Sequence, residues 1–139
     1  MFARRLGVVG AIAASGVLLC AQGAYATGGG LNTGAEGFVY NNVTVGGVTF
    51  TGSCQYDNGA SGLTISGQAT AAGQVTATTI TCTVKHFVGS DDVARATLPG
   101  PFAAVEAERL VNPGSAICID MSAVKLDASF ADTGQYCVF

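Results

Sequence analysis

The chain contains one histidine, His86, and its imidazole is the side chain best suited to acid–base chemistry near neutral pH. His86 follows Ile80, Cys82 and Val84 at alternate positions, so on a strand it continues an apolar face. A serine hydrolase would also need a nucleophile on a sharp turn, and the sequence has no Gly-x-Ser-x-Gly motif. We therefore predict that His86 packs at a strand end, that no residue is catalytic and that the protein is not an enzyme.

Two pairs of acidic residues could support other chemistry. Asp91 and Asp92 could contribute to a calcium site, but calcium needs several oxygen ligands and no ladder of acidic residues surrounds them. Glu106 and Glu108 could act as the two carboxylates of a glycosidase. At a spacing of two they would instead share one solvent-exposed face of a strand. We expect a solvated loop for the first pair, a wet surface for the second, and no metal or cofactor.

Four cysteines, Cys54, Cys82, Cys118 and Cys137, lie downstream of the N-terminal leader described below. A zinc site would need all four as ligands, and no Cys-x-x-Cys pair is present. An even number in an exported chain predicts two disulfides. Three pairings exist, and we favour Cys54–Cys82 because both cysteines alternate in phase with apolar residues and so face the core. That choice leaves Cys118–Cys137, where the flanking isoleucines leave the buried face undecided.

The segment Asp132-Thr133-Gly134-Gln135-Tyr136-Cys137 resembles the Asp-x-Gly-x-Tyr-x-Cys signature of immunoglobulin domains. The residue between Tyr136 and Cys137 is missing, so alternation would place these two side chains on opposite faces of a strand. The chain also has no tryptophan. We therefore expect a turn that leads into a disulfide-bonded last strand, without membership of that family.

Residues 1–26 have the three parts of a cleaved secretory signal peptide. Arg4 and Arg5 supply the positive region, residues 6–19 form an uncharged apolar run, and Ala24-Tyr25-Ala26 offers a cleavage site. A short leader interrupted by glycines suits a bacterial source. We expect a secreted or envelope-associated protein that has no membrane span after cleavage.

The charge balance narrows the partners of the mature chain. Loss of two arginines with the leader leaves four basic residues against nine acidic ones, a formal charge of −5 with the histidine neutral. A sparse acidic surface repels nucleic-acid phosphates and anionic lipid headgroups. We therefore predict no nucleic-acid binding.

Composition and alternation predict an all-β fold. Glycine and threonine are abundant, tryptophan is absent, and strong helix formers are scarce. We expect strands at Phe38–Val45, Val48–Tyr56, Leu63–Thr70, Gln74–Phe87, Val93–Leu98, Ser115–Met121, Val124–Phe130 and Gln135–Phe139. Within the expected strand Gln74–Phe87 we predict a bulge where Val75 and Ala77 give way to Ile80 and Cys82.

Residues 102–111 could form either a short helix or a further strand. Residues 27–37 are expected to be a flexible glycine-rich arm. The predicted architecture is a single disulfide-bonded domain, residues 38–139, folded as a small antiparallel β-sandwich or partly closed barrel of about eight strands with at most one short helix.

These features favour an exported non-enzymatic binding or structural module that contacts an unknown protein or an envelope or matrix component. A small secreted protease inhibitor is the first alternative: the size and two disulfides resemble the bacterial subtilisin-inhibitor family, although the cysteine spacings differ, and Pro99-Gly100-Pro101 is the candidate rigid loop. A small hydrolase or toxin that uses His86 is the second. An inhibitor should present a protruding loop, a hydrolase a cleft that contains His86, and a structural module neither.

Overall fold

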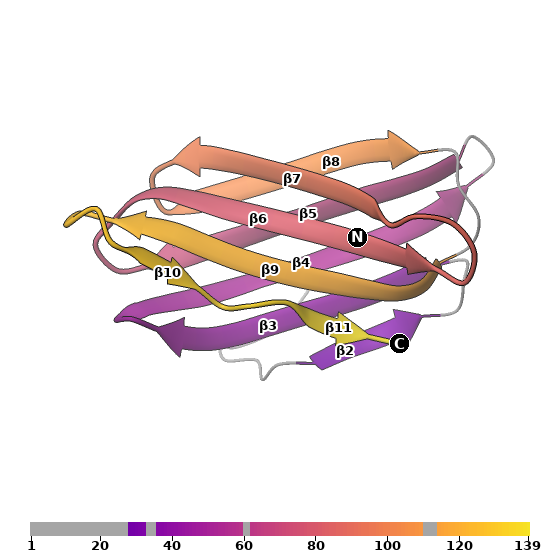
Figure 1. Ribbon diagram of the computed structural model, residues 1–139, viewed down its shortest axis with the longest axis horizontal. Helices are drawn as coiled ribbons and strands as arrows, with labels where there is room; N and C mark the ends of the chain where they lie inside the picture. Colours follow the sequence, from indigo (N-terminus) through magenta and orange to yellow (C-terminus); the bar gives the residue numbers. More distant parts are fainter. Residues whose placement is uncertain (1–27, 33–35, 60–61, 110–113) are drawn as a thin grey trace.

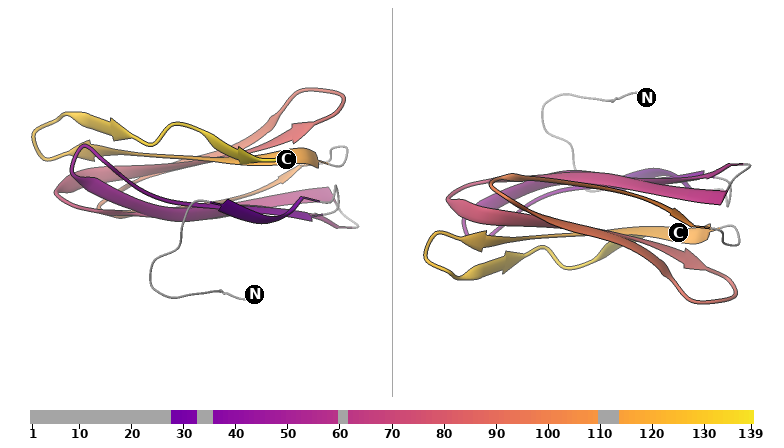
Figure 2. Two further views of the ribbon diagram at one scale, coloured as in Figure 1. Left: turned by 90° about the horizontal axis from the view of Figure 1, so that it is seen from below. Right: turned by 90° about the horizontal axis from the view of Figure 1, so that it is seen from above.

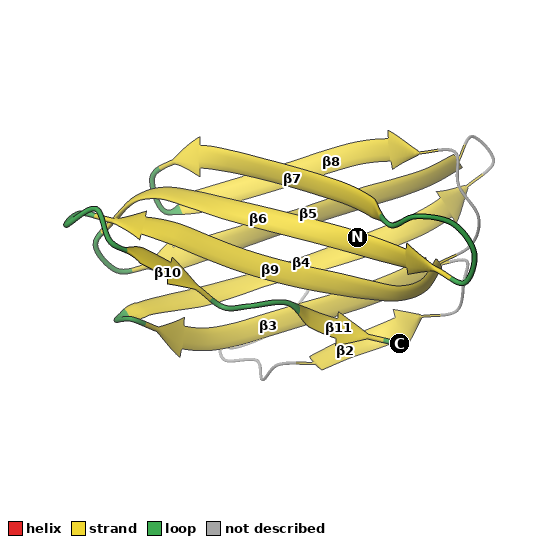
Figure 3. Ribbon diagram, in the orientation of Figure 1, coloured by secondary structure: helices red, strands yellow, loops and turns green. Residues whose placement is uncertain are grey.

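The computed structural model describes residues 28–32, 36–59, 62–109 and 114–139, and in these residues every regular element is a strand (Figure 3). The strands are β2 (Gly28–Asn32), β3 (Glu36–Val45), β4 (Val48–Gly59), β5 (Gly62–Ala72), β6 (Val75–His86), β7 (Asp92–Pro99), β8 (Phe102–Arg109), β9 (Gly114–Lys125), β10 (Phe130–Asp132) and β11 (Tyr136–Val138).

The strands form two antiparallel sheets that lie face to face (Figures 1 and 2). One sheet has the order β2-β3-β4-β5-β8. The other has the order β10-β9-β6-β7, and β11 pairs with β9 on the edge that β10 also occupies. The chain passes from one sheet to the other after β5, β7 and β8. The predicted antiparallel β-sandwich with two disulfides is confirmed, and the sheets do not close into a barrel.

Strand alternation determines the core, as the sequence predicts. Phe50 and Tyr56 on β4 are fully buried, as are Ile80 and Val84 on β6, and Cys54 and Cys82 lie in phase with them. These two cysteines form the predicted disulfide, with Cα atoms 5.7 Å apart, and so connect the two sheets through the core. Cys118–Cys137 is the second disulfide, also as predicted.

A glycine makes room for the bridge between the sheets. Gly67 on β5 pairs directly with Cys54 on β4. A Cβ atom at this position would clash with the Sγ atom of Cys82 and would lie 3.2 Å from the Sγ atom of Cys54. Only glycine therefore allows β5 to approach the disulfide this closely.

β6 has the expected kind of irregularity, a shift of register against β9, but it lies between Val75 and Ala77, slightly before the predicted position. The shift reverses the inward-facing positions along β6, because one extra residue changes the phase of the alternation. Thr78 becomes buried, and its hydroxyl donates a hydrogen bond of 2.7 Å to the carbonyl oxygen of Gly100.

The choice between helix and strand for residues 102–111 is resolved in favour of a strand as far as Arg109. The segment forms β8 and pairs with β5 from Phe102 to Arg109. Glu106 and Glu108 are both exposed at alternate positions, so they share one solvent-exposed face of the strand, as expected. Tertiary pairing with β5 thus outweighs the helical preference of the alanines and glutamates.

The prediction of one strand over Val124–Phe130 is wrong. β9 ends at Lys125, and the chain reverses before β10 begins at Phe130. The turn is closed by hydrogen bonds from the Lys125 N–H to the Ser129 carbonyl oxygen, 2.8 Å, and from the Ala128 N–H to the Lys125 carbonyl oxygen, 2.9 Å. Ala128 adopts a φ of 71°, which side chains other than glycine, asparagine and aspartate seldom accept.

An aspartate also stabilises this turn. The Oδ1 atom of Asp127 accepts a hydrogen bond of 2.9 Å from the Ser129 N–H and a second from the Ser129 hydroxyl. These bonds hold the pKa of Asp127 below its usual value, because they favour the ionised carboxylate. The apolar residues Leu126 and Phe130 project into solvent from the turn and the strand after it, although their alternation suggested a buried face.

The glycine-rich stretch predicted as a flexible arm contains strand β2, which pairs with β3 from Gly28 to Asn32. A Cβ atom at Gly29 would clash with the side chain of Val138 on β11. Here glycine therefore permits close packing rather than disorder. The predicted signal peptide, residues 1–26, lies outside the described residues.

Candidate functional site

The hairpin that joins β6 to β7 is the feature of this fold best placed to meet another molecule. It extends beyond one end of the sandwich and rises away from the facing sheet (Figure 2). β6 ends at His86 and β7 begins at Asp92. Gly89 turns the chain with a φ of 101°. We call residues 87–89 the apolar tip.

The apolar tip exposes two large side chains side by side. Phe87 is 88% exposed and Val88 is 74% exposed. Single exposed apolar residues are common on protein surfaces, but an adjacent aromatic and aliphatic pair at the apex of a projecting hairpin is a typical feature of a contact site. The tip can therefore insert apolar surface into a concave partner.

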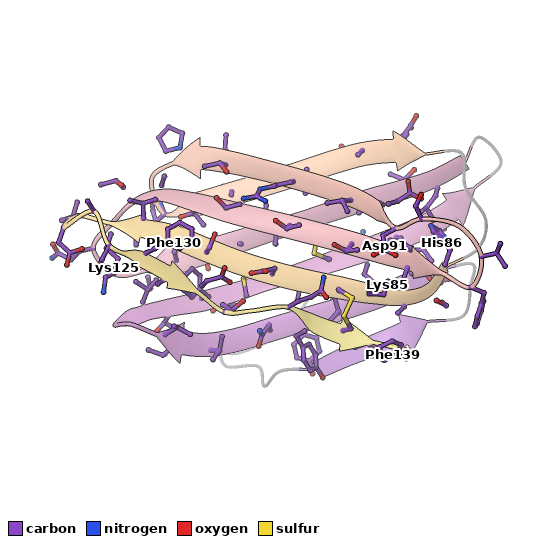
Figure 4. The ribbon with its side chains drawn as sticks, in the orientation of Figure 1. Lys85, His86, Asp91, Lys125, Phe130 and Phe139 are labelled. Atoms are coloured by element: carbon purple, nitrogen blue, oxygen red, sulfur yellow. A yellow bond between two sulfur atoms is a disulfide. The ribbon has the colours of Figure 1, made fainter. Side chains whose placement is uncertain are left out.

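A lysine–aspartate ion pair and a histidine–aspartate hydrogen bond join the strands just below the tip. The Nζ atom of Lys85 lies 3.0 Å from Oδ2 of Asp91, and both side chains are partly exposed. Nε2 of His86 lies 2.8 Å from Oδ2 of Asp92, and these side chains are only 3% and 13% exposed. Lys85, His86 and Asp91 gather at this end of the molecule (Figure 4). The inner pair is shielded from water, so it fixes the base of the hairpin more firmly than the outer one.

The burial of His86 bears on whether this side chain packs or could act in catalysis. A histidine bonded to an aspartate also occurs in serine hydrolases. A catalytic base must reach its substrate, and a side chain that is 3% exposed leaves almost no ring surface for one. The nearby hydroxyl of Ser115 donates a hydrogen bond of 3.2 Å to the Lys85 carbonyl oxygen. The arrangement supports the hairpin, as the predicted packing at the end of β6 implies.

The expectation that Asp91 and Asp92 form a solvated loop is only half right. Asp91 lies in the loop, but Asp92 is the first residue of β7 and is largely buried against His86. The sequence missed this pairing because the two partners are six residues apart across a turn. Among the residues that the structure describes, no group of three or more His, Cys, Asp or Glu side chains is arranged to hold a metal ion.

The loop predicted as the exposed rigid candidate is exposed at Pro99 and Pro101, and its backbone is hydrogen-bonded to the sandwich. Pro99-Gly100-Pro101 connects β7 to β8. The Gly100 N–H donates a hydrogen bond of 2.9 Å to the Thr76 carbonyl oxygen, and the Pro101 carbonyl oxygen accepts one of 2.9 Å from the Ala71 N–H. The sequence had placed Phe87 at the end of a strand. Its position two residues before the Gly89-Ser90-Asp91-Asp92 run was the signal for an exposed tip.

Comparison with known proteins adds no relative: no family model, no curated protein and no solved structure matches the chain. Across the described ranges, the structure contains no helix that is long and apolar enough to cross a membrane.

Proposed function

We propose that the protein is an exported, non-enzymatic β-sandwich that binds a partner protein through the apolar tip. The observation that carries this proposal is the exposure of Phe87 and Val88 on a hairpin whose base is held by the His86–Asp92 pair. Export is supported by the leader-like sequence of residues 1–26 and by the two disulfides, which persist in oxidising compartments.

The chemistry of the tip favours a concave, apolar binding pocket on a protein. Aromatic residues are common at the energetic centre of protein interfaces, and a rigid hairpin loses little conformational entropy when it binds. Phe87 and Val88 together are too small to anchor a protein in a bilayer, and the acidic surface would repel anionic headgroups. The partly exposed Lys85–Asp91 ion pair below the tip would form part of the rim of the contact.

A protease is a second candidate partner, because the protruding tip is the shape expected of an inhibitor. An exposed phenylalanine fits the hydrophobic specificity pocket of chymotrypsin-like enzymes. An inhibitor should lower the activity of chymotrypsin or subtilisin at equimolar concentration and should remain uncut at residues 87–90. Rapid cleavage there without inhibition would remove this candidate.

Site-specific photo-crosslinking tests the main proposal. A photoreactive amino acid replaces Val88 in the full chain. A matched variant carries the same amino acid at Phe139, which follows β11 and is 84% exposed. We expect a discrete adduct in the native secreted or envelope fraction only from position 88. An excess of unlabelled wild-type protein should abolish the adduct, and an excess of Phe87→Ser should not. Equal adducts from both positions, or equal competition by Phe87→Ser, would refute binding through the tip.

A histidine variant separates binding from catalysis. We expect His86→Gln to lower the free energy of unfolding by about 0.5–2 kcal/mol, because the bond to Asp92 is weakened, and to leave the crosslink at position 88 intact. Thermal unfolding and crosslinking measure the two effects. A variant with unchanged melting but no function would contradict the non-enzymatic proposal and favour the hydrolase.

A further inference from the structure

The last residues of the described chain run along the edge of β9 as a strap, which we define as residues 132–137. The Thr133 N–H donates a hydrogen bond of 2.9 Å to the Met121 carbonyl oxygen, and the Met121 N–H donates one of 3.1 Å to the Thr133 hydroxyl oxygen. Further on, Cys137 pairs with Cys118 and forms a disulfide with it. The strap is thus attached to β9 at two points.

A pair of carboxyl groups lies beside the first of these attachments. Asp120 is on the outer face of β9, and Asp132, at the start of the strap, pairs with Ser122 two positions further along. Residues placed diagonally in this way on one face of a sheet are within reach of each other. A side-chain hydrogen bond with Asp132 is one of the causes that raise the pKa of Asp120. Because an ionised carboxylate can only accept, this bond requires a proton on one of the two groups.

Little else in the strap or the sheet offsets the negative charge. The Oδ1 atom of Asp132 accepts a hydrogen bond of 2.8 Å from the Gly134 N–H, which ties the carboxyl group to the strap's own turn. On β6 the residue level with Asp120 is the uncharged Thr81, and Arg95 on β7 pairs with Thr81 from the other side. On β11 the outward position is occupied by Cys137 of the disulfide. Arg95 is therefore the basic group that acts on Asp120 from the neighbouring strands.

The balance of these effects favours the protonated form of Asp120. Burial, the hydrogen bond with Asp132 and the charge of Asp132 together raise the pKa of Asp120 from 3.8 to about 7, against the opposing effect of Arg95. When the strap lifts away, this environment is lost and the carboxyl group returns to its ordinary range. The closed strap therefore binds the proton more tightly than the open strap does, so closure weakens as the pH rises from about 4 through about 7.

We propose that Asp120 and Asp132 form a pH-operated latch for the C-terminal strap. Below neutral pH their shared proton holds the strap against β9. Above neutral pH Asp120 loses its proton and the hydrogen bond between the two side chains is lost. The strap then loosens around Thr133, and the Cys118–Cys137 disulfide keeps its end attached. Opening would uncover part of the edge of β9, which is otherwise paired with β10 and β11.

Hydrogen exchange of the full chain, corrected for the intrinsic effect of pH on exchange, measures the latch directly. We expect the protection of the Thr133 amide to fall by about tenfold or more between about pH 5.5 and about pH 8.5. The Gly100 amide, which is hydrogen-bonded at the junction of β7 and β8, should keep its protection. Equal protection of Thr133 at the two pH values would overturn the proposal.

Two variants and one spectroscopic measurement make the test specific. Asp120→Asn cannot ionise and keeps a hydrogen-bond donor, so Thr133 should stay protected at the higher pH. Glu106→Gln, on the exposed face of the other sheet, should behave like the wild type. A pH effect that persists in Asp120→Asn would contradict the latch. If that variant fails to fold, the carboxyl ¹³C titration of Asp120 in the wild type decides, and a midpoint below about 5 would overturn the proposal.

Discussion

The two disulfides occupy contrasting positions in one small sandwich. Cys54–Cys82 connects the two sheets inside the core, whereas Cys118–Cys137 connects two neighbouring strands at the edge of one sheet. The sequence separations are 28 and 19 residues, so the chain-entropy model assigns each bridge about 3–4 kcal/mol through the unfolded state. The difference between them must therefore come from the native surroundings. Loop length alone is a poor guide to what each bridge contributes.

The largest effect is expected when the bridge in the core is removed. Cys54→Ala combined with Cys82→Ala should lower the free energy of unfolding by about 4–5 kcal/mol, because a cavity between the sheets adds to the lost constraint. The whole sandwich should unfold at lower denaturant concentration. Urea titration followed by circular dichroism measures the loss.

The edge bridge should matter less and only locally. Cys118→Ala combined with Cys137→Ala should lower the free energy of global unfolding by about 2–3 kcal/mol, since the neighbouring β11 is short and partly exposed. Hydrogen exchange should increase first in the strap and β11 and should leave β4 and β6 protected. Equal losses from the two double variants, with the same exchange pattern, would refute the contrast between core and edge.

The sequence predicted the core bridge more firmly than the edge bridge, and the structure shows why. Cys54 and Cys82 lie on strands with one wet and one buried face, so alternation identifies the direction of each side chain. Cys118 lies between Ile117 and Ile119, and all three are buried. β9 is covered on both faces at that point, so alternation carries no information about direction there.

The remaining errors also have local causes. Leu126 and Phe130 follow the pattern of a half-buried strand, yet the hydrogen bonds between Asp127 and Ser129 turn the chain and leave both apolar side chains in solvent. A turn stabilised by side chains can therefore defeat a periodicity argument. The candidate site was missed for a related reason: Phe87 continued an apolar segment, and only the tertiary pairing of His86 with Asp92 shows where that strand ends.

A glycine-to-alanine substitution sharpens the comparison of the two bridges. The methyl group of Gly67→Ala would meet the Sγ atom of Cys82, so we expect the free energy of unfolding to fall by about 2 kcal/mol. Gly30→Ala is the matched control, because its methyl group would make only an ordinary contact of 3.7 Å with the ring of Phe38.

A double-mutant cycle then assigns the cost of Gly67→Ala to one bridge. In the chain that lacks Cys54–Cys82 both sulfur contacts are gone and the contact of 3.0 Å with the Ser53 carbonyl oxygen remains. The added methyl group can also fill part of the cavity, so the cost should fall to about 1 kcal/mol or less. In the chain that lacks Cys118–Cys137 the full cost should remain. That bridge lies at the sheet edge, and none of its atoms is among the three nearest to a Cβ atom at Gly67. Urea midpoints of the six chains, three backgrounds each with and without Gly67→Ala, give the coupling energies. The same cost in both backgrounds would mean that the disulfide in the core does not set the spacing between β5 and β6.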